Sequence, residues 1–101
     1  MIRGTTPKLT FNVHFDVSRI NVLWITFKQG SKIKFEKQLN DCVIVTEKNQ
    51  IIVNLTQQET LSLNANTDLN IQIRVGFKNG KRAASKLITT YVDEILHDGE
   101  I

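Results

Sequence analysis

Two residue types in this chain could take part in catalysis, the thiol of cysteine and the imidazole of histidine. Cys42 is the only cysteine, and His14 and His97 are the only histidines. A cysteine nucleophile needs a neighbouring base, and neither histidine lies in a known catalytic pattern. Cys42 falls instead on the apolar alternation of "DCVIVTE", where a free cysteine behaves as a small core residue. A single cysteine also excludes an internal disulfide and a cysteine-based metal site.

Other arrangements that support chemistry are weak in this sequence. The five glycines are scattered singly, whereas a phosphate-binding loop needs several between a strand and a helix. The two histidines have no acidic cluster around them, which argues against a metal site. Strands can bring distant carboxylates together as in a glycosidase, but the interior acidic residues are few. We therefore predict a protein that is not an enzyme and that has no cofactor and no metal.

Basic residues raise the alternative of nucleic-acid binding, because small β-barrels hold single strands along basic grooves beside aromatic platforms. Two predicted hairpins carry them: Lys28, Lys32, Lys34 and Lys37 on the first, and Arg74, Lys78, Lys81, Arg82 and Lys86 on the second. Only Trp24 and Tyr91 are available for stacking, and lysines also protect edge strands from aggregation. Nucleic-acid binding is therefore the weaker hypothesis.

Charge is divided unevenly along the chain. There are 13 lysines and arginines against 10 acidic residues, but four of the acidic residues follow residue 92. Residues 1–92 therefore carry a formal charge of +7, and the remaining residues carry −4. This asymmetry is typical of a tail that docks on a basic partner or on the body of a neighbouring copy. A solvated end that aids solubility is an equally good interpretation.

The elements that position these residues are predicted to be β-strands. Hydrophobic residues make up 41% of the 101 residues, which indicates one globular domain, residues 1–101. Near the start, Leu9, Phe11, Val13 and Phe15 alternate with polar residues, so the chain leads directly into a strand. We recognise neither a secretory signal nor a membrane span, and we expect a cytoplasmic protein that has no membrane contact.

The segment "VLWITFKQGSKIKFEK" predicts the first hairpin. If both apolar sets face one core, Phe27 lies opposite Ile33 and "QGS" forms a three-residue loop. This register turns Trp24 away from the core, opposite Glu36 and near Lys34. An outward tryptophan favours a binding role, because aromatic side chains anchor partner interfaces and sugar sites. The alternatives are that a loop or lysine stems cover Trp24, or that the strand is buried on both faces.

A second hairpin and a helical turn follow. In "DCVIVTEKNQIIVNL", the turn "EKNQ" pairs Cys42 with Leu55 and directs the thiol inward. Thr56 and Glu59 then have the spacing of a capping box. They predict one short helical turn near residues 56–60, at a point where immunoglobulin-like sandwiches cross between sheets.

The last hairpin is expected around an Asn79–Gly80 two-residue turn. Its first strand alternates regularly, but its second strand does not. A regular register places Lys86 on the inner face opposite Ile73, and a bulge near Ala84 and Ser85 would correct this. Together the strands predict an all-β, immunoglobulin-like antiparallel sandwich of about seven strands, with residues 92–101 as an acidic C-terminal extension.

The words "MIRGTTP", "ITFKQ", "LTQQETL" and "ASKLITT", in this order over nearly the whole chain, resemble a family of small proteins. These proteins are encoded among the tail and baseplate genes of phages and prophages of Gram-positive bacteria. The resemblance implies a virion component or an assembly factor, located in the host cytoplasm during assembly; only the first of these two roles places it in the virion afterwards. It implies other tail or baseplate proteins as partners, and it carries no catalytic residues.

We therefore expect a structural or protein-interaction module, for which a homo-oligomer is an open alternative. The candidate interaction surface comprises Trp24, Lys34, Glu36, Lys78, Lys81 and Arg82, together with the acidic extension. A carbohydrate-binding or receptor-adhesion module that stacks a glycan on Trp24 is the alternative hypothesis.

Overall fold

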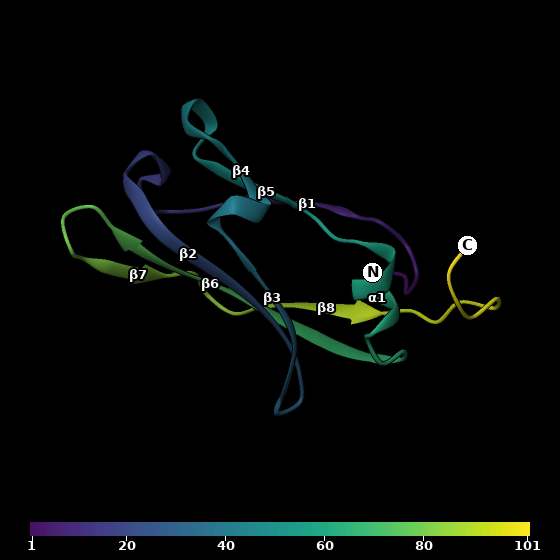
Figure 1. Cartoon of the computed structure of the whole chain (residues 1–101). Helices are drawn as coiled ribbons and strands as arrows, with labels where there is room; N and C mark the ends of the chain where they lie inside the picture. Colours follow the sequence, from purple (N-terminus) through teal and green to yellow (C-terminus); the bar gives the residue numbers. More distant parts are fainter.

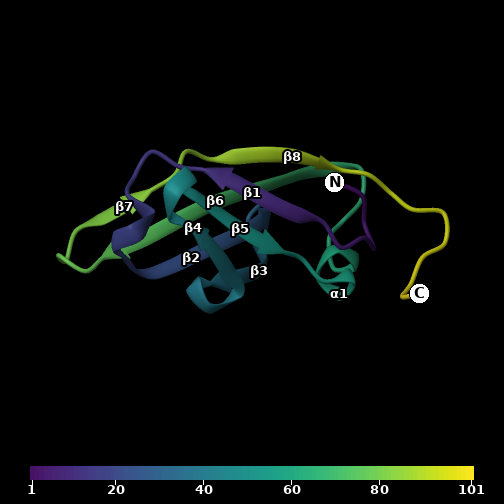
Figure 2. The ribbon, with the colours of Figure 1, turned by 90° about the horizontal axis from the view of Figure 1, so that it is seen from above.

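The structure is a computed structural model that describes residues 1–101. Its strands form two antiparallel sheets that pack face to face, seen from the side in Figure 1 and from above in Figure 2. The smaller sheet contains, in spatial order, β1 (Lys8–Asn12), β5 (Gln50–Asn54) and β4 (Cys42–Val45). The larger sheet contains β3 (Lys32–Gln38), β2 (Ile20–Gln29) and β6 (Thr67–Phe77), with β7 (Arg82–Ala84) and β8 (Ile88–Val92) both paired to the far edge of β6. The predicted all-β sandwich is confirmed.

The strand order is that of an immunoglobulin-like sandwich. Short helices η1 (Val17–Arg19), η2 (Leu39–Asp41) and α1 (Gln57–Leu61) lie where the chain crosses between sheets. The strands β7 and β8 pair with successive halves of β6, so they act as one interrupted strand. In immunoglobulin terms β1 holds the place of strand B and β7–β8 that of strand G. These two edges lie on the same side of the sandwich.

The core lies between the sheets and is formed mainly by β2, β6 and β5. Strand alternation turns every second side chain inward, and 14 apolar residues are buried. Leu23, Ile25 and Phe27 of β2 have no exposed surface, and neither does Ile73 of β6. Truncating one such side chain to alanine typically costs about 2–5 kcal/mol. The central strands therefore form a rigid base for the edges.

The register of the first hairpin differs from the prediction. The loop has two residues, because Gln29 pairs with Lys32 and Gly30 takes a positive φ of 58° at the first loop position. A bulge follows, in which Lys34 is the extra residue, and Phe27 therefore lies opposite Phe35 instead of Ile33. The two phenyl rings stack with their centroids 4.5 Å apart. Ile33 is on the outer side and is 53% exposed.

The second hairpin is also shifted, by two residues. Its turn contains the helix η3 (Thr46–Lys48) and Asn49, which has a φ of 53°, so Cys42 lies opposite Val53 and not Leu55. A shift of two residues keeps each side chain on its face. Cys42 therefore still points inward, where it packs half-buried against the core.

The helical turn is confirmed and the third hairpin needs a correction. The capping box is present: the Glu59 N–H donates to Thr56 Oγ1 (3.1 Å) and the Thr56 N–H donates to Glu59 Oε1 (2.8 Å). In the third hairpin the Phe77 N–H donates to the Lys81 carbonyl (2.8 Å), so the loop has three residues instead of two. Gly80, with a φ of 87°, takes the left-handed position of this loop.

The predicted bulge is present at residues 85–87. The Ser85 N–H donates to the Ile73 carbonyl (2.8 Å), and the Ile73 N–H donates back to Ser85 Oγ (3.0 Å). The register shifts by one residue between β7 and β8, which keeps Lys86 off the inner face and directs Ile88 toward the core. The Ser85 hydroxyl therefore accepts the hydrogen bond of the Ile73 N–H, which the interruption between β7 and β8 leaves without a backbone partner.

The first residues of the chain connect the end of β8 with α1. Ile2 forms a parallel bridge with Asp93, just after β8. Gly4 turns the chain with a φ of 73°, and a Cβ there would lie 2.9 Å from Ile95 Cδ1. The Thr60 hydroxyl donates to the Thr5 carbonyl at 2.7 Å.

The acidic extension begins one residue later than predicted, because Val92 belongs to β8 and is completely buried. Residues 93–101 leave the sandwich at the end that also carries the N-terminus (Figure 1). The structure contains no helix with the length and apolar character needed to cross a bilayer.

Candidate functional site

Trp24 lies on the outer face of the large sheet and is 40% exposed, as its strand position predicts. The bulge changes its neighbours: Trp24 pairs with Gln38, and Glu36 pairs with Thr26. The Thr26 hydroxyl donates to Glu36 Oε2 at 2.6 Å. The predicted pairing of Trp24 with Glu36 is therefore wrong, although both side chains still belong to the same face.

A shallow hollow of about 400 Å³ surrounds Trp24. Its lining includes Glu36, Arg74 and Arg82 beside the indole. The Arg82 Nη1 is held by the Gly80 carbonyl at 2.7 Å. Three of the predicted contact residues, Trp24, Glu36 and Arg82, thus meet at one place.

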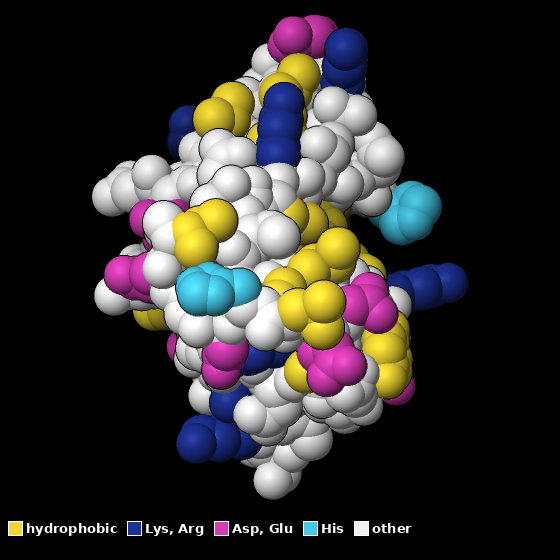
Figure 3. Space-filling model, turned by 90° about the vertical axis from the view of Figure 1, so that its right-hand side faces the viewer, with side chains coloured by type: hydrophobic (Ala, Val, Ile, Leu, Met, Phe, Trp, Pro, Cys, Tyr) yellow, Lys and Arg dark blue, Asp and Glu magenta, His cyan; other side chains and the backbone are white.

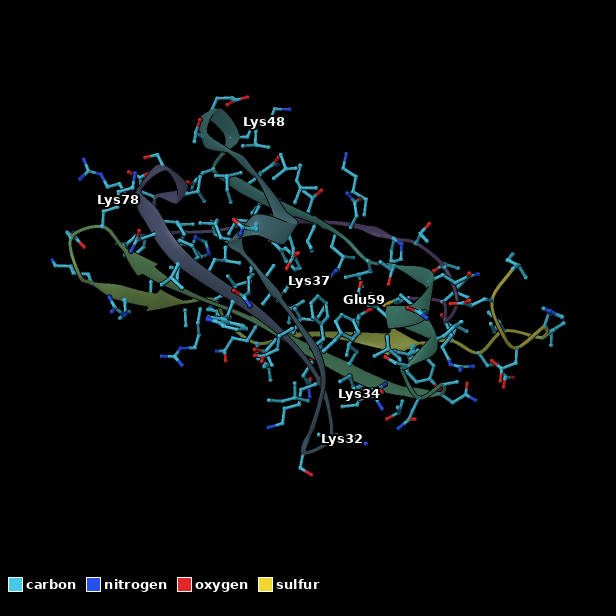
Figure 4. All side chains as sticks on the ribbon, in the orientation of Figure 1. Lys32, Lys34, Lys37, Lys48, Glu59 and Lys78 are labelled. Carbon is cyan, nitrogen blue, oxygen red and sulfur yellow. The ribbon has the colours of Figure 1, made fainter.

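The other three predicted contact residues lie elsewhere. Lys34 is near Lys32, toward the tip of the β2–β3 hairpin (Figure 4). Lys78 and Lys81 belong to the exposed β6–β7 loop.

The lysines as a group do not line one groove. In Figure 4, Lys32 and Lys34 lie at one tip of the molecule, Lys48 at the β4–β5 turn and Lys78 at the end of β6. Lys37 points inward toward α1, where its Nζ lies 2.8 Å from Glu59 Oε2. The two basic hairpins are neighbours in the large sheet, but their labelled lysines lie at different ends of it, which weakens the hypothesis of a nucleic-acid groove.

Cys42, His14 and His97 are the side chains that the sequence offers for catalysis. Burial raises the pKa of the Cys42 thiol to about 11, and the neighbouring Asp41 carboxylate adds to this effect. A raised pKa reduces the thiolate that a nucleophile needs. His14 and His97 are exposed, and no three His, Cys, Asp or Glu side chains gather as metal ligands.

A hollow of about 820 Å³ lies between β1 and the β7–β8 edge, and sequence reasoning missed it. We name it the edge groove. Its apolar lining comes from both sheets: Leu9, Phe11, Val13 and Phe15 from β1 and the loop after it, Ile71 and Ile73 from β6, and Ile88 from β8. The β1 side chains and Ile88 are only partly buried, whereas those of the central strands are fully covered. The sandwich is therefore open along this side.

Backbone hydrogen bonds show that β1 presents a free edge to this groove. The Leu55 N–H donates to the Pro7 carbonyl (3.0 Å), and the Val13 N–H donates to the Asn49 carbonyl (3.4 Å). Successive residues of a strand direct their backbone groups to opposite sides. The odd-numbered residues of β1 therefore face β5, and the N–H and C=O of even-numbered residues such as Thr10 point away from it.

The opposite edge, β8, already carries a short strand at one end. The Asp93 N–H donates to the Met1 carbonyl (2.7 Å), and the Arg3 N–H donates to the Asp93 carbonyl (3.1 Å). By the same alternation, the backbone groups of Thr89 point outward along β8. The first residues of the chain thus show how an extended segment pairs with this edge, and they stop where the chain turns at Gly4.

No protein-family model, no curated protein and no solved structure matches this chain. The edge groove can bind an extended apolar segment through backbone hydrogen bonds and side-chain packing. The Ser85 hydroxyl in its lining is hydrogen-bonded to backbone groups of Ile73 and Lys86.

Proposed function

We propose that this protein is a non-enzymatic structural or protein-interaction module that holds an extended segment of a partner in the edge groove. The observation that carries the proposal is the apolar hollow between two facing strand edges. An added strand gains backbone hydrogen bonds along an edge, and alternate side chains give it specificity. Each such bond contributes roughly 1 kcal/mol net.

Partial burial of the groove lining supports this proposal. Leu9, Phe11 and Ile88 pack against the core but remain partly in contact with water. Covering apolar surface of this kind gains about 25 cal/mol per Å². A segment that filled the groove would pair with the free edge of β1, which would then have a neighbouring strand on both sides, as β5 already has.

The binding mode can be tested with a random peptide display library selected on the immobilised protein. We expect peptides with alternating apolar residues that bind at micromolar concentration. Thr10→Pro removes an outward N–H without removing a β1–β5 hydrogen bond, and it should abolish binding, whereas Thr10→Val should retain it. If Thr10→Pro bound the peptides as well as the parent protein, strand addition to β1 would be excluded.

The setting that we propose is the tail or baseplate of a phage or prophage, in the finished particle or during its assembly. The support is the resemblance of "MIRGTTP" and the later words to proteins encoded among such genes. Peptide mass spectrometry on density-purified particles should find the protein at a constant ratio to the major tail protein. Absence from particles, with abundance in the lysate, would favour an assembly factor instead.

Carbohydrate binding at Trp24 is a second candidate function, and the hollow beside the indole favours it. Glu36, Arg74 and Arg82 offer hydrogen-bonding groups next to an exposed aromatic ring, which is the combination that sugar sites use. A glycan array with the parent protein and Trp24→Ala tests it. Glycan signals that depend on Trp24 would support adhesion, and an array without signal would remove this candidate.

A further inference from the structure

The acidic extension carries the most exposed apolar side chains of the molecule. Leu96 is 102% exposed and Ile101 is 97% exposed. Figure 3 looks onto the end of the molecule where the extension lies, and it shows hydrophobic and acidic side chains next to each other. Apolar side chains in water gain free energy when a surface covers them.

Few contacts hold the extension on its own sandwich. The Arg3 Nη1 lies 3.2 Å from Asp98 Oδ1, but the Asp98 side chain is 72% exposed. The Ile101 N–H donates to Gln57 Oε1 at 3.3 Å. Exposed ion pairs contribute little to stability, so residues 96–101 can leave this position at small cost.

The charges of the edge groove and of the extension are complementary. Lys8 and Lys86 line the groove together with His14, and no aspartate or glutamate does. The extension holds Asp93, Glu94, Asp98 and Glu100 and contains no lysine or arginine. Complementary charges of this kind favour association and fix its direction.

The extension of the same chain does not lead into its own groove. At Asp93 the edge of β8 is occupied by Met1 and Ile2, which also line that end of the groove. Beyond Asp93 the chain runs away from β7 (Figure 1). To enter its own groove, the extension would have to reverse direction at Asp93, which is held by backbone hydrogen bonds to Met1 and Arg3.

We infer that the edge groove receives the acidic extension of a second copy of this chain. The inference rests on the proposed function, because it names the segment that fills the groove. Six residues, 96–101, span about 20 Å when extended at roughly 3.3 Å per residue, which is sufficient to follow the edge of β1. In an extended segment Leu96, Asp98 and Glu100 face one side and Ile101 faces the other. Ile101 therefore enters the apolar hollow, and Asp98 and Glu100 lie beside the lysines of the rim.

This contact joins different surfaces of the two copies. The donor uses residues 96–101 and the acceptor uses the edge groove, so each copy can donate and accept at once. Contacts of this kind form rings when the rotation between copies closes and filaments when it does not.

Sedimentation velocity of the full chain, from about 1 µM to 1 mM, tests the inference over the range of weak to moderate affinities. We expect the average mass to rise with concentration. The variant Leu96→Asp/Ile101→Asp changes only exposed residues and should remain monomeric. A parent protein that is monomeric throughout, or an aspartate variant that associates like the parent, would overturn the inference.

A charge exchange locates the contact. Lys8→Glu/Lys86→Glu and Asp98→Lys/Glu100→Lys should each weaken self-association at least about tenfold, and a mixture of the two variants should restore it. Lys48→Glu, at the distant β4–β5 turn, is the matched control and should behave like the parent. If the mixture did not associate, the pairing of groove and extension would be wrong.

A competition experiment separates this inference from the proposed function. The synthetic peptide EILHDGEI, residues 94–101, should displace a labelled library peptide from the groove of the Leu96→Asp/Ile101→Asp variant. Library peptides that bind through the edge of β1 but are not displaced would leave the proposed function standing and reject the second copy as occupant. If no library peptide bound, the proposed function would fail with the inference.

Discussion

The Arg3 side chain donates a hydrogen bond of 2.8 Å from its Nε to the carbonyl oxygen of Leu63. Its Nη2 reaches the carbonyl of Leu61 at 2.9 Å, so one guanidinium satisfies two backbone acceptors at the carboxyl end of α1. The side chain is only 18% exposed. The opening segment of the sequence therefore has a structural role: it ties the helix between the sheets to the end of β8.

Arg3→Lys is expected to lower the free energy of unfolding by about 1–3 kcal/mol. A lysine ammonium cannot reproduce the planar fork that serves both carbonyls, and a buried carbonyl that loses its donor carries this cost. Urea denaturation measures the change. Asp98→Asn removes only the exposed ion partner of Arg3 and should change stability by less than about 0.5 kcal/mol. Equal effects of the two substitutions would contradict the capping role.

Asn49 connects two loops through three side-chain hydrogen bonds. Its Nδ2 donates to the carbonyls of Val13 (2.8 Å) and Phe15 (2.7 Å), and its Oδ1 accepts from the Val17 N–H (3.0 Å). We expect Asn49→Ala to cost about 2 kcal/mol or more, because it leaves these groups unpaired and places alanine at a positive φ.

Asn66 provides the matched control for this prediction, because it also has a positive φ, of 60°. Its side chain makes one long, exposed contact of 3.4 Å with Glu94. Asn66→Ala should therefore report the backbone strain alone, about 1 kcal/mol. Thermal or urea unfolding of both variants gives the difference. If both lost the same stability, the Asn49 hydrogen bonds would contribute nothing measurable.

Side-chain alternation was sufficient to predict which face of its strand Trp24 or Cys42 occupies. It was not sufficient to predict the register, because register depends on how each loop closes. The β2–β3 loop has two residues, with Gly30 at its first position. The bulge at Lys34 then places Phe35, and not Ile33, opposite Phe27 on the inner face. Asn49 takes the left-handed position that moves the second turn by two residues. The length of each loop and the position of each bulge depend on local backbone energies, and the alternation of apolar and polar residues carries no information about these energies.

The edge groove could not be predicted from the sequence for a different reason. Leu9 and Phe11 have the pattern of ordinary core residues, and their partial exposure follows from the position of β1 at the edge of its sheet. Which strand lies at an edge is decided by pairing between residues distant in sequence. The capping box of Thr56 and Glu59, in contrast, is local, and it was predicted correctly.

Cys42 is expected to react slowly with thiol reagents. Its pKa of about 11, raised from 9.0 by burial, leaves roughly 100-fold less thiolate at pH 8 than an unperturbed thiol has. Iodoacetamide labelling followed by mass spectrometry, in native buffer and in urea, measures the ratio of rates. A native rate equal to the unfolded rate would show an accessible thiolate.

The raised pKa of Cys42 also predicts that the stability of the folded state falls at alkaline pH. The folded state favours the protonated thiol, so its contribution is fully present below the pKa of the unfolded thiol, near 9, and is lost as the pH rises toward 11. Urea unfolding of the parent protein and of Cys42→Ala between pH 8 and pH 11 isolates this contribution. The stability difference between the two should narrow over this range, and a constant difference would contradict the shifted pKa.

The Glu59 carboxylate has two partners, and a double-mutant cycle can separate them. Its Oε1 accepts the Thr56 N–H of the capping box, and its Oε2 lies 2.8 Å from Lys37 Nζ, whose side chain is only 11% exposed. Glu59→Gln retains an acceptor for Thr56 but leaves the lysine charge unpaired, which we expect to cost about 1–3 kcal/mol. With Lys37→Met in the background the same substitution should cost little.

The coupling energy of Lys37 and Glu59 should therefore be about 1–3 kcal/mol, measured by urea denaturation of the four proteins of the cycle. High salt should reduce it only slightly, because partly buried pairs are weakly screened. The exposed pair Arg19 and Asp16, 3.4 Å apart, is the matched control and should couple by less than about 1 kcal/mol. If Lys37 and Glu59 coupled no more strongly than this pair, the ion pair would not help to hold α1 against the edge strand β3, and the capping box alone would explain the position of Glu59.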